Sequence, residues 1–185
     1  SNNILGPDGK ISEVAQKAIA AKLATVLDIG RVMDALLVDC PYEMYWFEKT
    51  IGMGWNYRIG GTTAAIKVFD FQLGFAVANE FAAAAEFTTD VSKTATPKKA
   101  AENAAKIVAE NAGKSDYEKL KAYKNKICEL VDYNFDAVKD DNTPYGNPWQ
   151  LIWVFDDDPT TKVVCEGYSK AFQYLCDLSS FTDNI

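Results

Sequence analysis

Near the start of the chain, hydrophobic residues recur every three to four positions, which is the spacing of one face of an α-helix. Residues 11–26 follow this pattern, and Ser12 or Asp8 stands where an N-cap is expected. A second run, over residues 29–38, repeats the spacing and ends before Pro41, which disfavours helical geometry in the residue before it. The sequence therefore predicts two consecutive helices.

The next part of the chain has the composition of β-strands. Three segments rich in aromatic and β-branched residues follow one another, at residues 44–47, 55–59 and 69–73. Gly60 and Gly61 lie between the last two segments and predict a hairpin turn. The alternation of apolar and polar residues slips between Val68 and Phe69, which is typical of a β-bulge. We expect a small antiparallel sheet packed on the two helices.

The chain then returns to helical patterns. An alanine-rich run at residues 76–87 favours a helix by intrinsic propensity, and residues 88–97 have the composition of a linker. Pro97 suits the first turn of a further helix, which we expect to end at Gly113 with that glycine as a left-handed cap. The predicted buried stripe of this helix consists of Ala101, Ala104, Ala105 and Val108.

Ser115 and Glu118 have the spacing of a capping box, because each side chain can bind the backbone N–H of the other residue. The helix that follows carries a predicted apolar stripe at Leu120, Tyr123, Ile127, Leu130 and Val131. Residues 140–148 are rich in turn formers, and residues 149–155 form an apolar patch. Together these elements predict an α+β fold that is predominantly helical.

The composition of the chain excludes several classes of protein and partner. The chain has 185 residues, of which 48% are hydrophobic and 24% charged, so it is typical of a globular protein rather than a disordered one. Its net charge of -7 repels polyphosphates, and we expect no nucleic-acid partner. No run approaches the ~20 apolar residues of a membrane span. The four cysteines lack CxxC spacing, so no metal or cofactor is predicted, while one or two disulfides stay open.

The stretch from Val163 to Cys176 carries the strongest chemical signal. Its apolar residues lie three and four positions apart, at Tyr168, Ala171, Phe172 and Leu175, and predict a helix with Cys165 in its first turn. The backbone N–H groups and the dipole at a helix start favour a thiolate and can hold an oxyanion. Gly167 allows close approach of a substrate or strand. The alternative is a buried cysteine that only packs.

The sequence of residues 164–172, V-C-E-G-Y-S-K-A-F, is similar to the V-C-x-G-Y-(A/S)-x-A-F pattern of the bacterial members of the transglutaminase-like superfamily. Cys165 matches the family's nucleophile, and Gly167 and Tyr168 match the positions after it. Residues 117–134 and 147–155 resemble the helix and loop that precede it, and residues 40–47 resemble an aromatic segment often found before the core. The resemblance covers most of residues 40–180.

The resemblance implies a cysteine enzyme that acts on amide or peptide bonds by acyl transfer, with peptidase or amidase action expected ahead of cross-linking. It also implies that Trp149, Trp153, Gly167 and Tyr168 line the site, although two tryptophans in an apolar patch are also typical of a core. Family members use a His and an Asp on strands after the cysteine helix, whereas this chain has no histidine and stops at Ile185. We therefore expect a truncated chain that is inactive alone.

On this interpretation residues 1–90 form an N-terminal α+β region, and residues 96–185 form the helical half of a transglutaminase-like core whose main sheet is missing. The expected partner is a peptide or protein substrate, and the expected location is extracellular or at the cell surface. The face left open by truncation predicts a homodimer. The alternatives are a short inactive homologue, or a binding or scaffold module of a cell-surface protein that uses the aromatic residues 44–73.

Overall fold

The computed structural model describes residues 4–49, 53–62, 65–84, 87–140, 142–143 and 149–183. The fold is α+β and mostly helical, as predicted. Contacts divide the chain into two compact units, of which the first consists of residues 1–37 and 54–74 and the second of residues 38–53 and 75–185. The predicted division between residues 90 and 96 therefore lies inside the second unit. Within the described ranges, no helix is both long and apolar enough to cross a membrane.

The two N-terminal helices form as predicted. Helix α1 spans Glu13–Ala24 and helix α2 spans Ile29–Asp39. Ser12, rather than Asp8, is the N-cap of α1, and its hydroxyl accepts a hydrogen bond of 3.3 Å from the backbone N–H of Ala15. The first unit buries few side chains in these two helices: Ala15, Ile19 and Met33.

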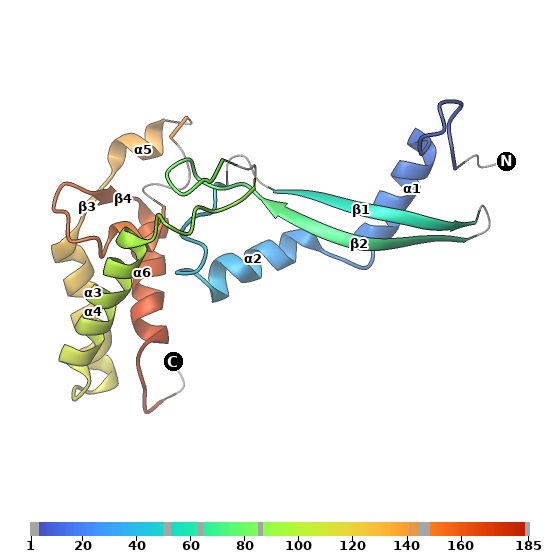
Figure 1. The fold of residues 1–185 in the computed structure, drawn as a ribbon. Helices are drawn as coiled ribbons and strands as arrows, with labels where there is room; N and C mark the ends of the chain where they lie inside the picture. The colour runs from blue at the N-terminus through green and yellow to red at the C-terminus, as the bar shows by residue number, and fades with distance from the viewer. Residues whose placement is uncertain are drawn as a thin grey trace. The chain divides into compact units, whose positions relative to one another are not determined.

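The predicted hairpin is present, but the predicted position of its turn is wrong. Strand β1 (Met53–Thr62) pairs with strand β2 (Ala65–Phe75) in an antiparallel two-stranded sheet (Figure 1). Gly60 and Gly61 lie inside β1, and the connection falls at residues 63–64, outside the described residues. A Cβ at Gly60 would lie 3.0 Å from the ring of Phe69, so this glycine makes room for an aromatic side chain instead of turning the chain.

Strand β2 has a local irregularity close to the predicted slip between Val68 and Phe69. Asp70 has a φ of 53°, a left-handed conformation that is uncommon for a residue other than glycine. Its carboxylate lies 3.2 Å from the guanidinium of Arg58 on β1, and that guanidinium lies 5.7 Å from the centre of the Phe69 ring. The left-handed conformation of Asp70 is thus accompanied by an exposed ion pair across the hairpin.

Three helices and one short 3-10 helix form the core of the second unit. Helices α3 (Ala95–Asn111), α4 (Asp116–Leu130) and α6 (Cys165–Asp177) pack against one another, and η1 (Leu151–Trp153) packs against α3 and α6 (Figure 1). The fully buried side chains include Tyr123, Leu151, Ile152, Phe155, Val163 and Leu175. The predicted apolar patch at residues 149–155 is therefore a central part of this core.

The start of α4 was predicted correctly and the end of α3 was not. The hydroxyl of Ser115 accepts a hydrogen bond from the backbone N–H of Glu118, whose carboxylate accepts one from the N–H of Ser115, so the capping box is complete. Gly113 does not have a positive φ. Helix α3 ends at Asn111, and its C-cap is Ala112, whose N–H donates to the carbonyl of Ala109 at 3.3 Å. The buried stripe of α3 is Ala100, Ala104, Ile107 and Asn111, and Ala105 is exposed.

The helix predicted at residues 76–87 is absent from the described part of that segment. Its first residues run beside residues 46–48, where the N–H of Ala78 donates to the carbonyl of Trp46 at 2.8 Å and the N–H of Glu48 donates to the carbonyl of Ala76 at 3.0 Å. The segment 44–47, predicted as a strand, forms turns up to Trp46 and one bridge from Phe47 to Val77. Long-range pairing has overridden the helix propensity of alanine.

A second, very short sheet joins the end of α4 to the start of α6. Strand β3 (Asp132–Tyr133) lies parallel to strand β4 (Lys162–Val163), and helix α5 (Phe135–Lys139) follows β3. The N–H of Asn134 extends the ladder by donating to the carbonyl of Val163 at 2.9 Å. Backbone pairing with β3 therefore holds strand β4 in place immediately before the chain enters α6.

Candidate functional site

Cys165 is the first residue of α6 and follows directly from the anchored strand β4. Val163 and Val164 are buried, whereas the thiol of Cys165 is free and exposed. The packing alternative considered from the sequence, a cysteine sealed in the core, does not describe this residue. The strand–helix junction leaves this residue exposed at the surface.

The start of α6 has features that stabilise negative charge. Val164 occupies the N-cap position and supplies no side-chain hydrogen bond to the helix. The N–H groups of the first turn therefore receive no help from a cap, and together with the helix dipole they favour an anion at this end. A thiolate on Cys165, or an oxyanion formed next to it, would lie at this end of the helix.

Gly167 and Tyr168, two further residues of the motif on α6, make contacts within the second unit. Gly167 is buried on the side of α6 that faces the core. The hydroxyl of Tyr168 donates a hydrogen bond of 2.7 Å to the carbonyl of Val131, and its ring stacks on that of Tyr133 at 6.1 Å between centroids. Burial, followed by the charge of nearby acidic groups, raises the pKa of Tyr168. Tyr168 thus ties α6 to the segment that joins α4 and β3.

The two tryptophans predicted to line the site lie in and beside η1. Trp153 is the last residue of η1 and is partly buried against the core, with its ring 6.5 Å from that of Phe81. Trp149 is partly exposed and lies just before η1. Gln150, which separates Trp149 from η1, is fully buried and donates a hydrogen bond of 3.0 Å to the carbonyl of Met44. Trp153 therefore packs against the core while it stays partly exposed.

A buried charged group beside the first turn of α6 was missed by the sequence analysis. Lys170 is only 5% exposed, and its Nζ lies 3.0 Å from a carboxylate oxygen of Glu166 and 3.3 Å from the side-chain oxygen of Gln150. Burial lowers the pKa of Lys170, and the charge of Glu166 opposes that effect. The i,i+4 spacing of Glu166 and Lys170 was visible in the sequence, but it did not indicate burial.

The remaining cysteines are not joined in disulfides. Cys128 was predicted to be a small core residue, and this is wrong, because it is exposed on α4 one position beyond the buried stripe that ends with Ile127. Cys40 and Cys176 are partly buried, and burial raises the pKa of Cys176. Among the residues that the structure describes, no three His, Cys, Asp or Glu side chains gather in a way that could hold a metal ion.

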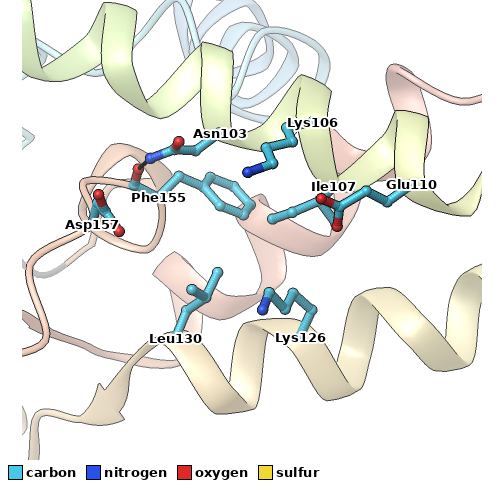
Figure 2. A pocket seen from close by; sticks show the side chains of 8 residues that line it. All are labelled: Asn103, Lys106, Ile107, Glu110, Lys126, Leu130, Phe155 and Asp157. Atoms are coloured by element: carbon cyan, nitrogen blue, oxygen red, sulfur yellow. Dashed lines mark hydrogen bonds between the residues drawn. The ribbon is translucent and has the colours of Figure 1, made fainter.

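A cavity of about 180 Å³ lies between α3 and α4, and Cys165 is not among the residues that line it (Figure 2). Its apolar lining is Ile107, Leu130 and Phe155. Figure 2 shows Lys106 and Lys126 extending into it from the two facing helices. Glu110 and Asp157 also line the cavity, so its charges are mixed and favour neither anions nor cations.

No model of a known protein family matches this chain, and no curated protein sequence matches it. The resemblance to transglutaminase-like proteins consequently rests on the motif around Cys165 and the segments before it. What the geometry adds is independent of that resemblance: an exposed, free thiol at the uncapped start of a helix.

Proposed function

We propose that this chain carries the nucleophile of a cysteine enzyme that acts on amide or peptide bonds by acyl transfer. The observation that supports the proposal best is the position of Cys165, free and exposed at the first residue of α6. The expected substrate is a peptide or protein, and peptidase or amidase action is proposed ahead of cross-linking. An extracellular or cell-surface location belongs to the same proposal.

The proposed reaction begins with attack of the Cys165 sulfur on the carbonyl carbon, which forms a C–S bond and places negative charge on the carbonyl oxygen. The first N–H groups of α6 would stabilise that charge. The thiol proton goes to a base and then to the departing amine as the C–N bond breaks, and water or a second amine later cleaves the thioester. The 185 residues contain no histidine, so an imidazole base would have to be supplied from outside this chain.

The test compares two exposed thiols in the same molecule. Cys165 lies at the N-terminal, positive end of the α6 dipole. Cys128 lies near the C-terminal, negative end of α4, which spans Asp116–Leu130. Peptide-resolved mass spectrometry should show that iodoacetamide labels Cys165 roughly threefold to tenfold faster than Cys128 at pH 7. An activated ester such as p-nitrophenyl acetate should acylate Cys165 and leave the thioester uncleaved for lack of a base. Equal labelling of the two thiols, or a slower reaction at Cys165, would contradict the proposal.

A second candidate function is binding by the first unit, with a second copy of the chain as partner. Two hollows of about 360 and 390 Å³ lie beside α1, lined mainly by apolar residues that include Trp55 and Phe71 in one and Val68 in the other. Trp55 and Phe69 are also exposed. Analytical ultracentrifugation of the wild type and of Trp55→Ser would test this self-association. A wild type that is monomeric at every concentration would contradict a role of these surfaces in binding a second copy.

A further inference from the structure

Glu166 is a negatively charged residue in the same helical turn as the proposed nucleophile. It directly follows Cys165 in the first turn of α6, where a carboxylate is favourable for the helix because it faces the positive end of the dipole. The same carboxylate is unfavourable for a thiolate on the preceding residue, because two like charges close together oppose ionisation. A site built around Cys165 therefore needs something that offsets Glu166.

Lysines face both oxygens of that carboxylate. Lys170 Nζ lies 3.0 Å from Glu166 Oε1, and Lys49 Nζ lies 4.0 Å from Glu166 Oε2. The two lysines differ in environment, because the side chain of Lys49 is 51% exposed and that of Lys170 is 6% exposed. Water and salt screen the Lys49 contact, whereas the Lys170 contact acts at lower local dielectric and is the stronger of the two.

The Lys170 ammonium is held in place from two further segments. It donates to the side-chain oxygen of Gln150, just before η1, and the amide nitrogen of Gln150 donates to the carbonyl of Met44. Gln150 is fully buried, so this chain of contacts has little freedom to rearrange. A buried ion pair is weak evidence for stability, because removing both charges together is often neutral. Stability alone therefore does not explain why a buried Lys170 is paired with Glu166 in the first turn of α6.

We infer that Lys170 is a positioning residue for the nucleophile, which fixes and neutralises the Glu166 carboxylate so that the start of α6 can stabilise charge on Cys165 without opposition. The inference rests on the proposed function, since it concerns the reactivity of Cys165. The described contacts of Lys170 are with Glu166 and Gln150. It acts through Glu166, and its effect is electrostatic and short in range.

The experiment measures the rate at which iodoacetamide labels Cys165 at pH 7 and low salt, divided by the rate at Cys128 in the same sample. In Lys170→Met this ratio should fall about threefold to tenfold, because the charge of Glu166 is no longer offset by the buried ammonium. Adding Glu166→Gln to that variant should restore the ratio to within about twofold of the wild type. In 1 M salt the deficit of Lys170→Met should shrink, since screening acts over about 3 Å at that concentration.

Lys119 offers a matched control. It is also buried, at 8% exposed, and its Nζ lies 3.7 Å from the carboxylate of Asp116 one turn earlier on α4. Lys119→Met therefore also removes a buried lysine from an ion pair, but at α4 instead of the first turn of α6. We expect it to lower stability and to leave the ratio of the two labelling rates unchanged.

The possible outcomes separate the two proposals. If the wild-type ratio is high and Lys170→Met matches Lys119→Met in ratio and salt response, the role of Lys170 is overturned while the proposed function stands. If Cys165 reacts no faster than Cys128 in the wild type, the proposed function itself fails. Should Lys170→Met not fold, Glu166→Gln alone decides, because it leaves the ammonium in place and must raise the ratio; an unchanged or lower ratio overturns the inference.

Discussion

Replacing Tyr168 with phenylalanine tests whether this residue holds α6 in place or acts at the site. The change removes one hydroxyl, which donates to the carbonyl of Val131 at 2.7 Å, and keeps the ring that stacks on Tyr133. Val131 is buried, at 5% exposed, so its carbonyl cannot easily exchange the lost donor for water. The structure therefore predicts a loss of stability without a loss of reactivity at Cys165.

The size of the loss follows from the single bond that is removed. A hydrogen bond contributes about 1 kcal/mol net, and an acceptor left without a partner in a buried place costs about 1–3 kcal/mol. Because Tyr168 is only partly buried and water can reach part of the gap, we expect Tyr168→Phe to lower the free energy of unfolding by about 1–2 kcal/mol. For a chain of this length that corresponds to a fall in Tm of roughly 2–8 °C.

Urea unfolding followed by tryptophan fluorescence measures this change, since Trp46, Trp149 and Trp153 all belong to the second unit. Tyr117→Phe is a suitable control, because Tyr117 is 73% exposed and should give no measurable change. The labelling ratio of Cys165 to Cys128 should stay at the wild-type value in both variants. Wild-type stability of Tyr168→Phe combined with a reduced ratio would refute this reasoning and return Tyr168 to the site.

Two further expectations concern other parts of the second unit. Asp116 accepts hydrogen bonds from the N–H groups of Asp183 and Thr182, which hold its pKa below the ordinary value of 3.8. A carboxylate whose pKa is lower in the folded than in the unfolded protein stabilises the fold above the unfolded pKa, and this stabilisation is lost as the pH falls through the folded pKa. The amide-exchange protection of Thr182 and Asp183 should therefore drop below about pH 4. In Asp116→Ala it should stay low at every pH. Leu175→Ala removes a fully buried side chain from α6 and should cost about 3–5 kcal/mol in urea unfolding; a loss below 1 kcal/mol would contradict the packing of α6.

Features that depend on a few neighbouring residues could be predicted from the sequence. Helices α1, α2, α4 and α6 form where the apolar periodicity predicted helices, although α1 buries Ala15 and Ile19 and leaves Val14 exposed. The caps at Ser12 and Ser115 follow from the spacing of donors and acceptors within four residues. Cys165 was placed in a first turn by the stripe that follows it. In each of these cases the determining contacts lie within the element itself, so local pattern was sufficient.

Features that depend on distant residues could not be predicted. The described residues of the alanine-rich run 76–87 form no helix, because the start of the run pairs with residues 46–48 and the sequence holds no local sign of that pairing. Gly60 and Gly61 were interpreted as a turn, but the ring of Phe69 on the opposite strand explains the need for a glycine at position 60. The predicted stripe of α6 contained no lysine, because the buried Lys170 is held by Gln150, which lies 20 positions away in the sequence, as well as by Glu166.

The reactivity of the Cys165 thiol and the catalytic turnover of an amide substrate depend on different groups. In the proposal, the helix start and the ion pairs of Glu166 with Lys170 and Lys49 stabilise the thiolate, and none of these groups is an imidazole. The sequence has no histidine, so a thioester on Cys165 has no such base in this chain to activate water. Reactivity toward alkylating agents and activated esters should therefore be a property of the second unit, whereas repeated cleavage of amides should require a base that these residues do not contain.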